Sequence, residues 1–82
     1  MNIYVVIPAY NEAERIESTL EMVARAGQYR VVVVDDGSSD DTYRLALRHV
    51  TTLRHRVNRG MGAALATGTA YALAHGADCI VH

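Results

Sequence analysis

The sequence predicts an α/β fold in which helices cover both faces of a parallel sheet. Residues 3–7 and 31–34 are runs of consecutive apolar, mostly β-branched residues, which are typical of strands buried on both faces. Segments with helical spacing of apolar residues alternate with the strand-like segments, and this alternation favours parallel strands joined by right-handed crossovers. The expected order is β-α-β-α-β-α-β, truncated in the fourth strand, so we expect an incomplete domain.

The composition limits the classes of protein to which the chain can belong. Its 82 residues are 50% hydrophobic, which is typical of one small packed domain. The formal net charge of −1 gives no electrostatic reason to expect nucleic acid or an anionic membrane surface as a partner. The single Cys79 excludes an internal disulfide, and no apolar run is long enough to span a membrane. We therefore expect a cytoplasmic location, or the cytoplasmic membrane face for a full-length protein.

The first half of the chain predicts a strand, a helix and a second strand. The first strand is expected over Ile3–Ile7 and ends at Pro8, which lacks a backbone donor. A helix should follow from about residue 12 to residue 26, with Asn11 as its N-cap, because its apolar residues fall on one face. The second strand is expected over Tyr29–Val34.

The second half predicts four further elements. They are a helix over residues 40–50, an edge strand over 53–57, a helix over 63–75 and a strand from residue 79. Ser38 or Ser39 can cap the first of these helices. The second helix is rich in alanine and contains Gly68, which indicates close packing against a neighbour. Cys79 is expected to be a buried strand residue.

Three loops should meet where the parallel strands end, and open α/β sheets bind ligands at that edge. They are Pro8–Glu12, Asp35–Ser38 and Asn58–Gly62. Together they offer an aromatic ring to stack on a base, carboxylates to accept hydrogen bonds, and an arginine and helix N-termini for phosphate. These loops predict a nucleotide site, although Asp35 and Asp36 are also ordinary residues for a turn or a helix cap.

A dinucleotide-binding oxidoreductase is the obvious competing interpretation. That class needs Gly-x-Gly-x-x-Gly in the first strand-to-helix turn, where the backbone approaches the pyrophosphate. Here that turn, Pro8–Glu12, contains no glycine, and Gly60 and Gly62 follow the third strand instead. The position of the glycines therefore argues against this class.

The three loops and their flanking residues resemble the start of a family 2 glycosyltransferase of GT-A, Rossmann-like fold. The matching segments are Val6–Glu12 (VIPAYNE), Val33–Asp40 (VVDDGSSD) and Asn58–Ala64 (NRGMGAA). The polyprenyl-phosphate mannosyl- and glucosyltransferases are the most similar branch. The resemblance implies that residues 1–82 are the N-terminal, nucleotide-sugar-binding part of an inverting enzyme. Its donor would be a nucleotide diphosphate sugar, and its acceptor a lipid phosphate such as a polyprenyl phosphate.

The resemblance assigns seven residues to the nucleotide site. They are Pro8, Tyr10, Glu12, Val34, Asp35, Asp36 and Arg59. Tyr10 would lie beside the base and Asp36 would accept a hydrogen bond from its ring N–H, while Asp35 would brace the loop. Arg59 would approach the diphosphate or hold the neighbouring loop. A solvated loop arginine is an equal interpretation of Arg59, and helix-dipole stabilisation is an equal interpretation of Glu12.

The chain contains no residue to which the resemblance assigns a catalytic or metal-binding role. The divalent metal that the family implies, Mg²⁺ or Mn²⁺, would have its ligands beyond residue 82, as would the general base. The four histidines lack metal-ligand spacing, so ordinary surface or core roles are expected for them. Two alternatives remain open. One is a non-catalytic nucleotide-binding module or truncated gene product. The other is a nucleotidyltransferase, which usually has a glycine- and arginine-rich first loop that Pro8–Glu12 lacks.

Overall fold

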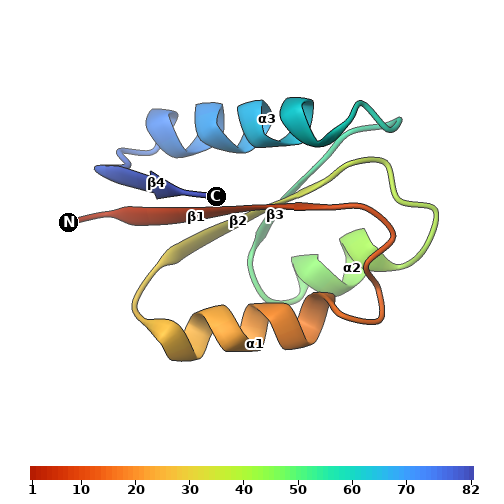
Figure 1. The fold of residues 1–82 in the computed structure, drawn as a ribbon, viewed down its shortest axis with the longest axis horizontal. Helices are drawn as coiled ribbons and strands as arrows, with labels where there is room; N and C mark the ends of the chain where they lie inside the picture. Colours follow the sequence, from red (N-terminus) through yellow and green to blue (C-terminus); the bar gives the residue numbers. More distant parts are fainter.

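The computed structural model describes all 82 residues and contains one four-stranded parallel sheet in the order β3-β2-β1-β4 (Figure 1). The elements are β1 (Ile3–Ala9), α1 (Ile16–Ala26), β2 (Arg30–Asp35), α2 (Thr42–Leu47), β3 (Thr51–Arg54), α3 (Met61–Ala74) and β4 (Cys79–Val81). One face of the sheet is covered by α3 and the other by α1 and α2. The predicted α/β fold and element order are confirmed.

The valines of β2 supply the centre of two separate cores. Val32, Val33 and Val34 are all fully buried, and successive strand residues point to opposite faces of a sheet. Val32 and Val34 pack in a cluster with alanines of α3, whereas Val33 packs with residues of α1 and α2. Strand β2, which was expected to be buried on both faces, therefore contributes to the core on each side of the sheet.

Strand β1 continues through Pro8 to Ala9, two residues beyond its predicted end. The Ala9 carbonyl accepts a hydrogen bond from the Asp36 N–H at 2.8 Å, and amide groups of successive strand residues face alternate neighbours. The proline therefore faces the side of β4, where pairing covers only Ile3–Val5. Its missing N–H breaks no ladder bond there, so β1 does not end at Pro8.

Other element boundaries also differ from the predictions. Helix α1 begins at Ile16 because residues 12–15 form a turn, in which the Glu12 carbonyl accepts hydrogen bonds from the N–H groups of Arg15 and Ile16. Helix α2 is shorter at both ends than predicted. Strand β3 begins two residues earlier and ends three residues earlier than predicted, and Val57 is 66% exposed. Cys79, expected to be buried, is exposed on the short strand β4. No helix has both the length and the apolar character needed to cross a membrane.

Helix α3 packs closely on the sheet at Gly68, as its composition predicted. A Cβ atom at Gly68 would lie 2.3 Å from Val6 Cγ1 and 3.2 Å from Val34 Cγ2. Real Cβ atoms do not approach other heavy atoms so closely, so only glycine fits here without a shift of the helix or the sheet.

We expect Gly68→Ala to destabilise the chain and Gly62→Ala, in the same helix, to leave it equally or more stable. Overpacking a core costs about 1–3 kcal/mol. A Cβ at Gly62 would meet no atom within 4 Å, and alanine in place of glycine favours a helix by about 1 kcal/mol. Urea unfolding of both variants measures the difference. Equal midpoints for the two would contradict the observed packing.

Candidate functional site

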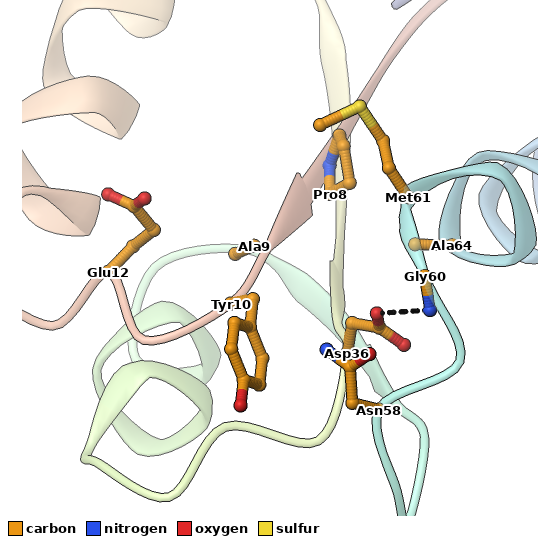
Figure 2. A pocket seen from close by; sticks show the side chains of 9 residues that line it. All are labelled: Pro8, Ala9, Tyr10, Glu12, Asp36, Asn58, Gly60, Met61 and Ala64. Carbon is orange, nitrogen blue, oxygen red and sulfur yellow. Dashed lines mark hydrogen bonds between the residues drawn. The ribbon is translucent and has the colours of Figure 1, made fainter.

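A pocket of about 270 Å³ opens where β1 and β2 end and α3 begins (Figure 2). The residues that line it come from the end of β1 and the loop after it, the residue after β2, the loop before α3 and α3 itself: Pro8, Ala9, Tyr10, Glu12, Asp36, Asn58, Gly60, Met61 and Ala64. The pocket therefore lies at the sheet edge where the sequence predicted the three loops to meet.

Asp36 holds the third loop against the end of β2. Its Oδ1 accepts hydrogen bonds from the Arg59 N–H at 2.9 Å and from His55 Nδ1 at 2.8 Å. Its Oδ2 accepts one from the Gly60 N–H at 2.8 Å (Figure 2). The residue is 4% exposed. The carboxylate therefore replaces water with protein donors on both of its oxygens.

These donors also set the charge state of Asp36. The hydrogen bond from His55, aided by the N–H groups of Arg59 and Gly60, lowers the pKa of Asp36 below its usual value of 3.8, although burial opposes the shift. Hydrogen bonds to the charged form favour that form. Asp36 is consequently an acceptor at neutral pH, and it contributes a negative charge to the lining of the pocket.

The first two loops are joined by side-chain to backbone hydrogen bonds. The Asn11 N–H donates to Ser38 Oγ at 2.8 Å, and Asn11 Oδ1 accepts from the Ser39 N–H at 2.9 Å. Asn11 adopts a left-handed φ of 51°. The prediction of Asn11 as an N-cap is wrong, because α1 begins five residues later and the side chain is used between loops.

The expected caps of α2 are also corrected. Neither Ser38 nor Ser39 donates or accepts a hydrogen bond at the start of α2. Asp40 Oδ1 accepts the N–H of Thr42, the first residue of that helix, and Thr42 Oγ1 in turn accepts the Glu12 N–H at 2.8 Å. The second loop is thus tied both to its own helix and to the first loop.

Gly37 lets the third loop pass directly beside the second. Its φ is 78°, and a Cβ there would lie 2.6 Å from the backbone of both Val57 and Asn58. Any side chain would separate the two loops, and the left-handed conformation also favours glycine.

Four of the seven predicted site residues line the pocket: Pro8, Tyr10, Glu12 and Asp36. Val34 does not, because it is fully buried in the core beneath α3. The Arg59 side chain lies outside the lining, although the Arg59 N–H binds Asp36. Glu12 also makes an ion pair with Arg15 at 3.0 Å.

That Asp35 braces the loop stays a prediction: its carbonyl accepts the His55 N–H at 2.9 Å, but no hydrogen bond of its side chain supports it. Its side chain is fully buried, and neither carboxylate oxygen has a hydrogen-bond partner. Its nearest cation is Arg54, whose Nε lies 3.5 Å from Oδ2. The side-chain hydrogen bonds that hold the third loop belong to Asp36, because β2 ends at Asp35 and the following residue turns toward that loop.

Sequence reasoning gave His55 only an ordinary role, and it assigned no ligand role to five lining residues: Ala9, Asn58, Gly60, Met61 and Ala64. His55 is 8% exposed and binds both Asp36 and Thr67. Nothing in the spacing of the histidines signals this contact, since 19 residues separate His55 from Asp36.

The pocket combines a half-exposed aromatic ring, apolar walls and carboxylates. Tyr10 is 49% exposed, and Pro8, Ala9, Met61 and Ala64 supply apolar surface. A flat heterocycle with N–H donors suits such a lining, because the ring can stack on Tyr10 and a donor can reach Asp36. No group of three or more His, Cys, Asp and Glu side chains is placed to hold a metal ion.

The chain resembles known proteins along nearly its whole length. Residues 4–77 match the family described as glycosyl transferase family 2. An uncharacterized protein of Methanocaldococcus jannaschii is 44% identical over 80 residues, covering 96% of this chain and 33% of that protein. The UDP-N-acetylglucosamine–dolichyl-phosphate N-acetylglucosaminyltransferase of Methanococcus voltae is 31% identical, covering 96% of this chain and 39% of that protein.

A third relative, the dolichol-phosphate mannosyltransferase of Pyrococcus furiosus, is 34% identical, covering 83% of this chain and 22% of that protein. The chain thus spans between 22% and 39% of the length of these relatives. No solved structure matches significantly.

We expect acid to destabilise the parent chain more steeply than an Asp36→Asn variant. A carboxyl whose folded pKa is lowered contributes stability above its unfolded value, here about 3.8, and loses it as the pH falls through the folded pKa. Asparagine does not titrate, so the variant lacks this contribution but retains that of Asp40, whose pKa is also lowered, chiefly by Thr42. Unfolding free energies between pH 7 and pH 2 measure the two slopes. Parallel curves would show that Asp36 is not held in its charged form.

Proposed function

Because this chain belongs to glycosyl transferase family 2, we propose that it binds the nucleotide of a nucleotide diphosphate sugar and forms the donor-binding part of a glycosyltransferase. The observation that carries the proposal is the pocket at the carboxyl edge of the sheet. There Tyr10, Asp36 and apolar side chains of β1 and α3 line one cavity.

Each lining group has a proposed role in holding the donor. The Tyr10 ring stacks on the base, and base–aromatic stacking tolerates different bases. Asp36 accepts a hydrogen bond from a ring N–H of the base. It is suited to this role because it is charged at neutral pH and touches the pocket. Pro8 and Met61 bound the base on its apolar faces.

The acceptor and the stereochemistry belong to the same proposal. Two relatives carry names that specify dolichyl- or dolichol-phosphate transfer, which supports a polyprenyl phosphate as acceptor. We propose inverting transfer and a place at the cytoplasmic face of a membrane with it, as the resemblance to the family implies. We propose that residues 1–82 provide the donor half of that reaction, and that the acceptor site and the general base belong to other residues.

A divalent metal, Mg²⁺ or Mn²⁺, belongs to the chemistry that the family implies. The residues of this chain do not fit such an ion, because no group of three or more His, Cys, Asp and Glu side chains is placed to hold one. The proposed role of this chain is therefore confined to holding the nucleotide.

The test is calorimetric titration of the chain with UDP, GDP, CDP, ADP and dTDP, with ribose 5-phosphate as a control that lacks a base. We expect at least one nucleoside diphosphate to bind and the control to bind far more weakly. Failure of all five to bind at millimolar concentration, by a chain shown to be folded by circular dichroism, would refute the proposal.

We expect Tyr10→Ala to weaken binding of the preferred nucleoside diphosphate, and Tyr10→Phe to preserve it. Loss of base–aromatic stacking costs about 1–3 kcal/mol, which is about 5- to 150-fold in Kd. Because Tyr10 is half-exposed, neither substitution should lower the melting temperature much. Tyr29→Ala is the matched control, since Tyr29 is 39% exposed just before β2 begins, at the opposite end of the sheet. An equal loss of affinity in Tyr29→Ala would show that stacking is not the cause.

A further inference from the structure

His55 bridges the pocket carboxylate and helix α3 from a buried position. It follows β3 directly, and its N–H donates to the Asp35 carbonyl at 2.9 Å. Nδ1 lies 2.8 Å from Asp36 Oδ1, and Nε2 lies 2.8 Å from Thr67 Oγ1 in α3. The backbone and both ring nitrogens are therefore fixed, so the ring has one orientation.

The contact with Asp36 requires a proton on Nδ1 of His55. The carboxylate of Asp36 can only accept, so Nδ1 donates to it. The Thr67 hydroxyl can donate or accept, so it can pair with Nε2, which lies 2.8 Å away. A carboxylate on Nδ1 is a common way of fixing the tautomer and orientation of a histidine.

The same bridge fixes the direction of the Asp36 carboxylate. Oδ1 accepts two hydrogen bonds, from His55 and Arg59, whereas Oδ2 accepts only one, from Gly60. Each carboxylate oxygen has two lone pairs. Oδ2 is therefore the oxygen with an unused lone pair, and Asp36 lines the pocket.

We propose that His55 is a positioning residue for nucleotide binding, which holds Oδ1 of Asp36 so that Oδ2 is presented to a donor group of the base. The inference rests on the proposed nucleotide-binding function. His55 does not contact the ligand and is absent from the lining of the pocket. It acts by preventing rotation of the carboxylate, so that the nucleotide meets an acceptor already in place.

Two substitutions separate this role from ordinary core packing. The side-chain amide of asparagine places a nitrogen near the position of Nδ1, whereas that of glutamine reaches the position of Nε2. His55→Asn therefore keeps a donor for Asp36 and loses the contact with Thr67. His55→Gln keeps the contact with Thr67 and loses the donor for Asp36. Both variants remove the imidazole ring and so lose similar packing.

The experiment is calorimetric titration of the parent, His55→Asn and His55→Gln with the nucleoside diphosphate that the parent binds most tightly, together with thermal melts. We expect His55→Gln to lose about tenfold or more in affinity, as is typical of a lost hydrogen bond to a charged group. His55→Asn should stay within about threefold of the parent, because a donor remains for the charged acceptor. Similar melting temperatures for the two variants would show that stability does not explain the difference.

Each result decides one proposal. Equal losses of affinity in the two variants, in step with their melting temperatures, would overturn the positioning role and leave the nucleotide site intact. A folded parent that binds no nucleoside diphosphate would instead overturn the nucleotide site and the positioning role with it.

If either variant fails to fold, a measurement on the parent chain still tests the positioning role of His55. Nitrogen-15 NMR of the His55 ring should show the tautomer protonated at Nδ1, and addition of the nucleoside diphosphate should shift that resonance while the resonance of the exposed His49 stays in place. A ring protonated at Nε2 alone, or a His55 signal insensitive to the nucleotide, would overturn the proposal.

Discussion

The geometry of the site depends on a buried negative charge. Asp36 is almost inaccessible to solvent, and a buried carboxylate is costly unless donors replace its water. The replacements are the N–H groups of Arg59 and Gly60 and the ring of His55. Because all three donors come from the segment between β3 and α3, satisfying this one charge also fixes where that segment runs.

The first two loops are held together by hydrogen bonds in which a hydroxyl side chain accepts a backbone N–H group of the first loop. Ser38 accepts the Asn11 N–H, and Thr42 accepts the Glu12 N–H. Loops that lack regular pairing must satisfy their backbone groups in this way. The residues that line the pocket therefore come from distant parts of the sequence, and the position of each loop depends on the positions of the others.

The sequence was sufficient to predict the layers of the fold and the sheet edge at which the loops meet. Long apolar runs such as Val31–Val34 indicate a buried strand without any knowledge of their partners. Sequence reasoning assigned the ligand contact to Asp36 rather than Asp35, but it was insufficient to predict that Asp36 also holds the third loop while the Asp35 side chain is buried without a hydrogen bond. That difference between the two aspartates depends on where β2 ends, and element ends depend on single hydrogen bonds such as the one from the Asp36 N–H to the Ala9 carbonyl. The role of His55 could not be predicted from the sequence for a related reason. Its partners lie on other elements, and no local sequence pattern brings them together.

The two adjacent aspartates occupy different chemical environments because of the pleat of β2. Alternation sends Val33 and Asp35 toward α1 and α2, where Asp35 is fully buried and its nearest cation is Arg54, which lies 4.8 Å over the ring of Tyr43. Asp36 follows the last residue of the strand and turns toward the opposite face, to His55 and α3. The pair therefore cannot bind one ion or one ligand together. Although the two side chains are neighbours in sequence, only Asp36 is placed to meet a molecule in the pocket.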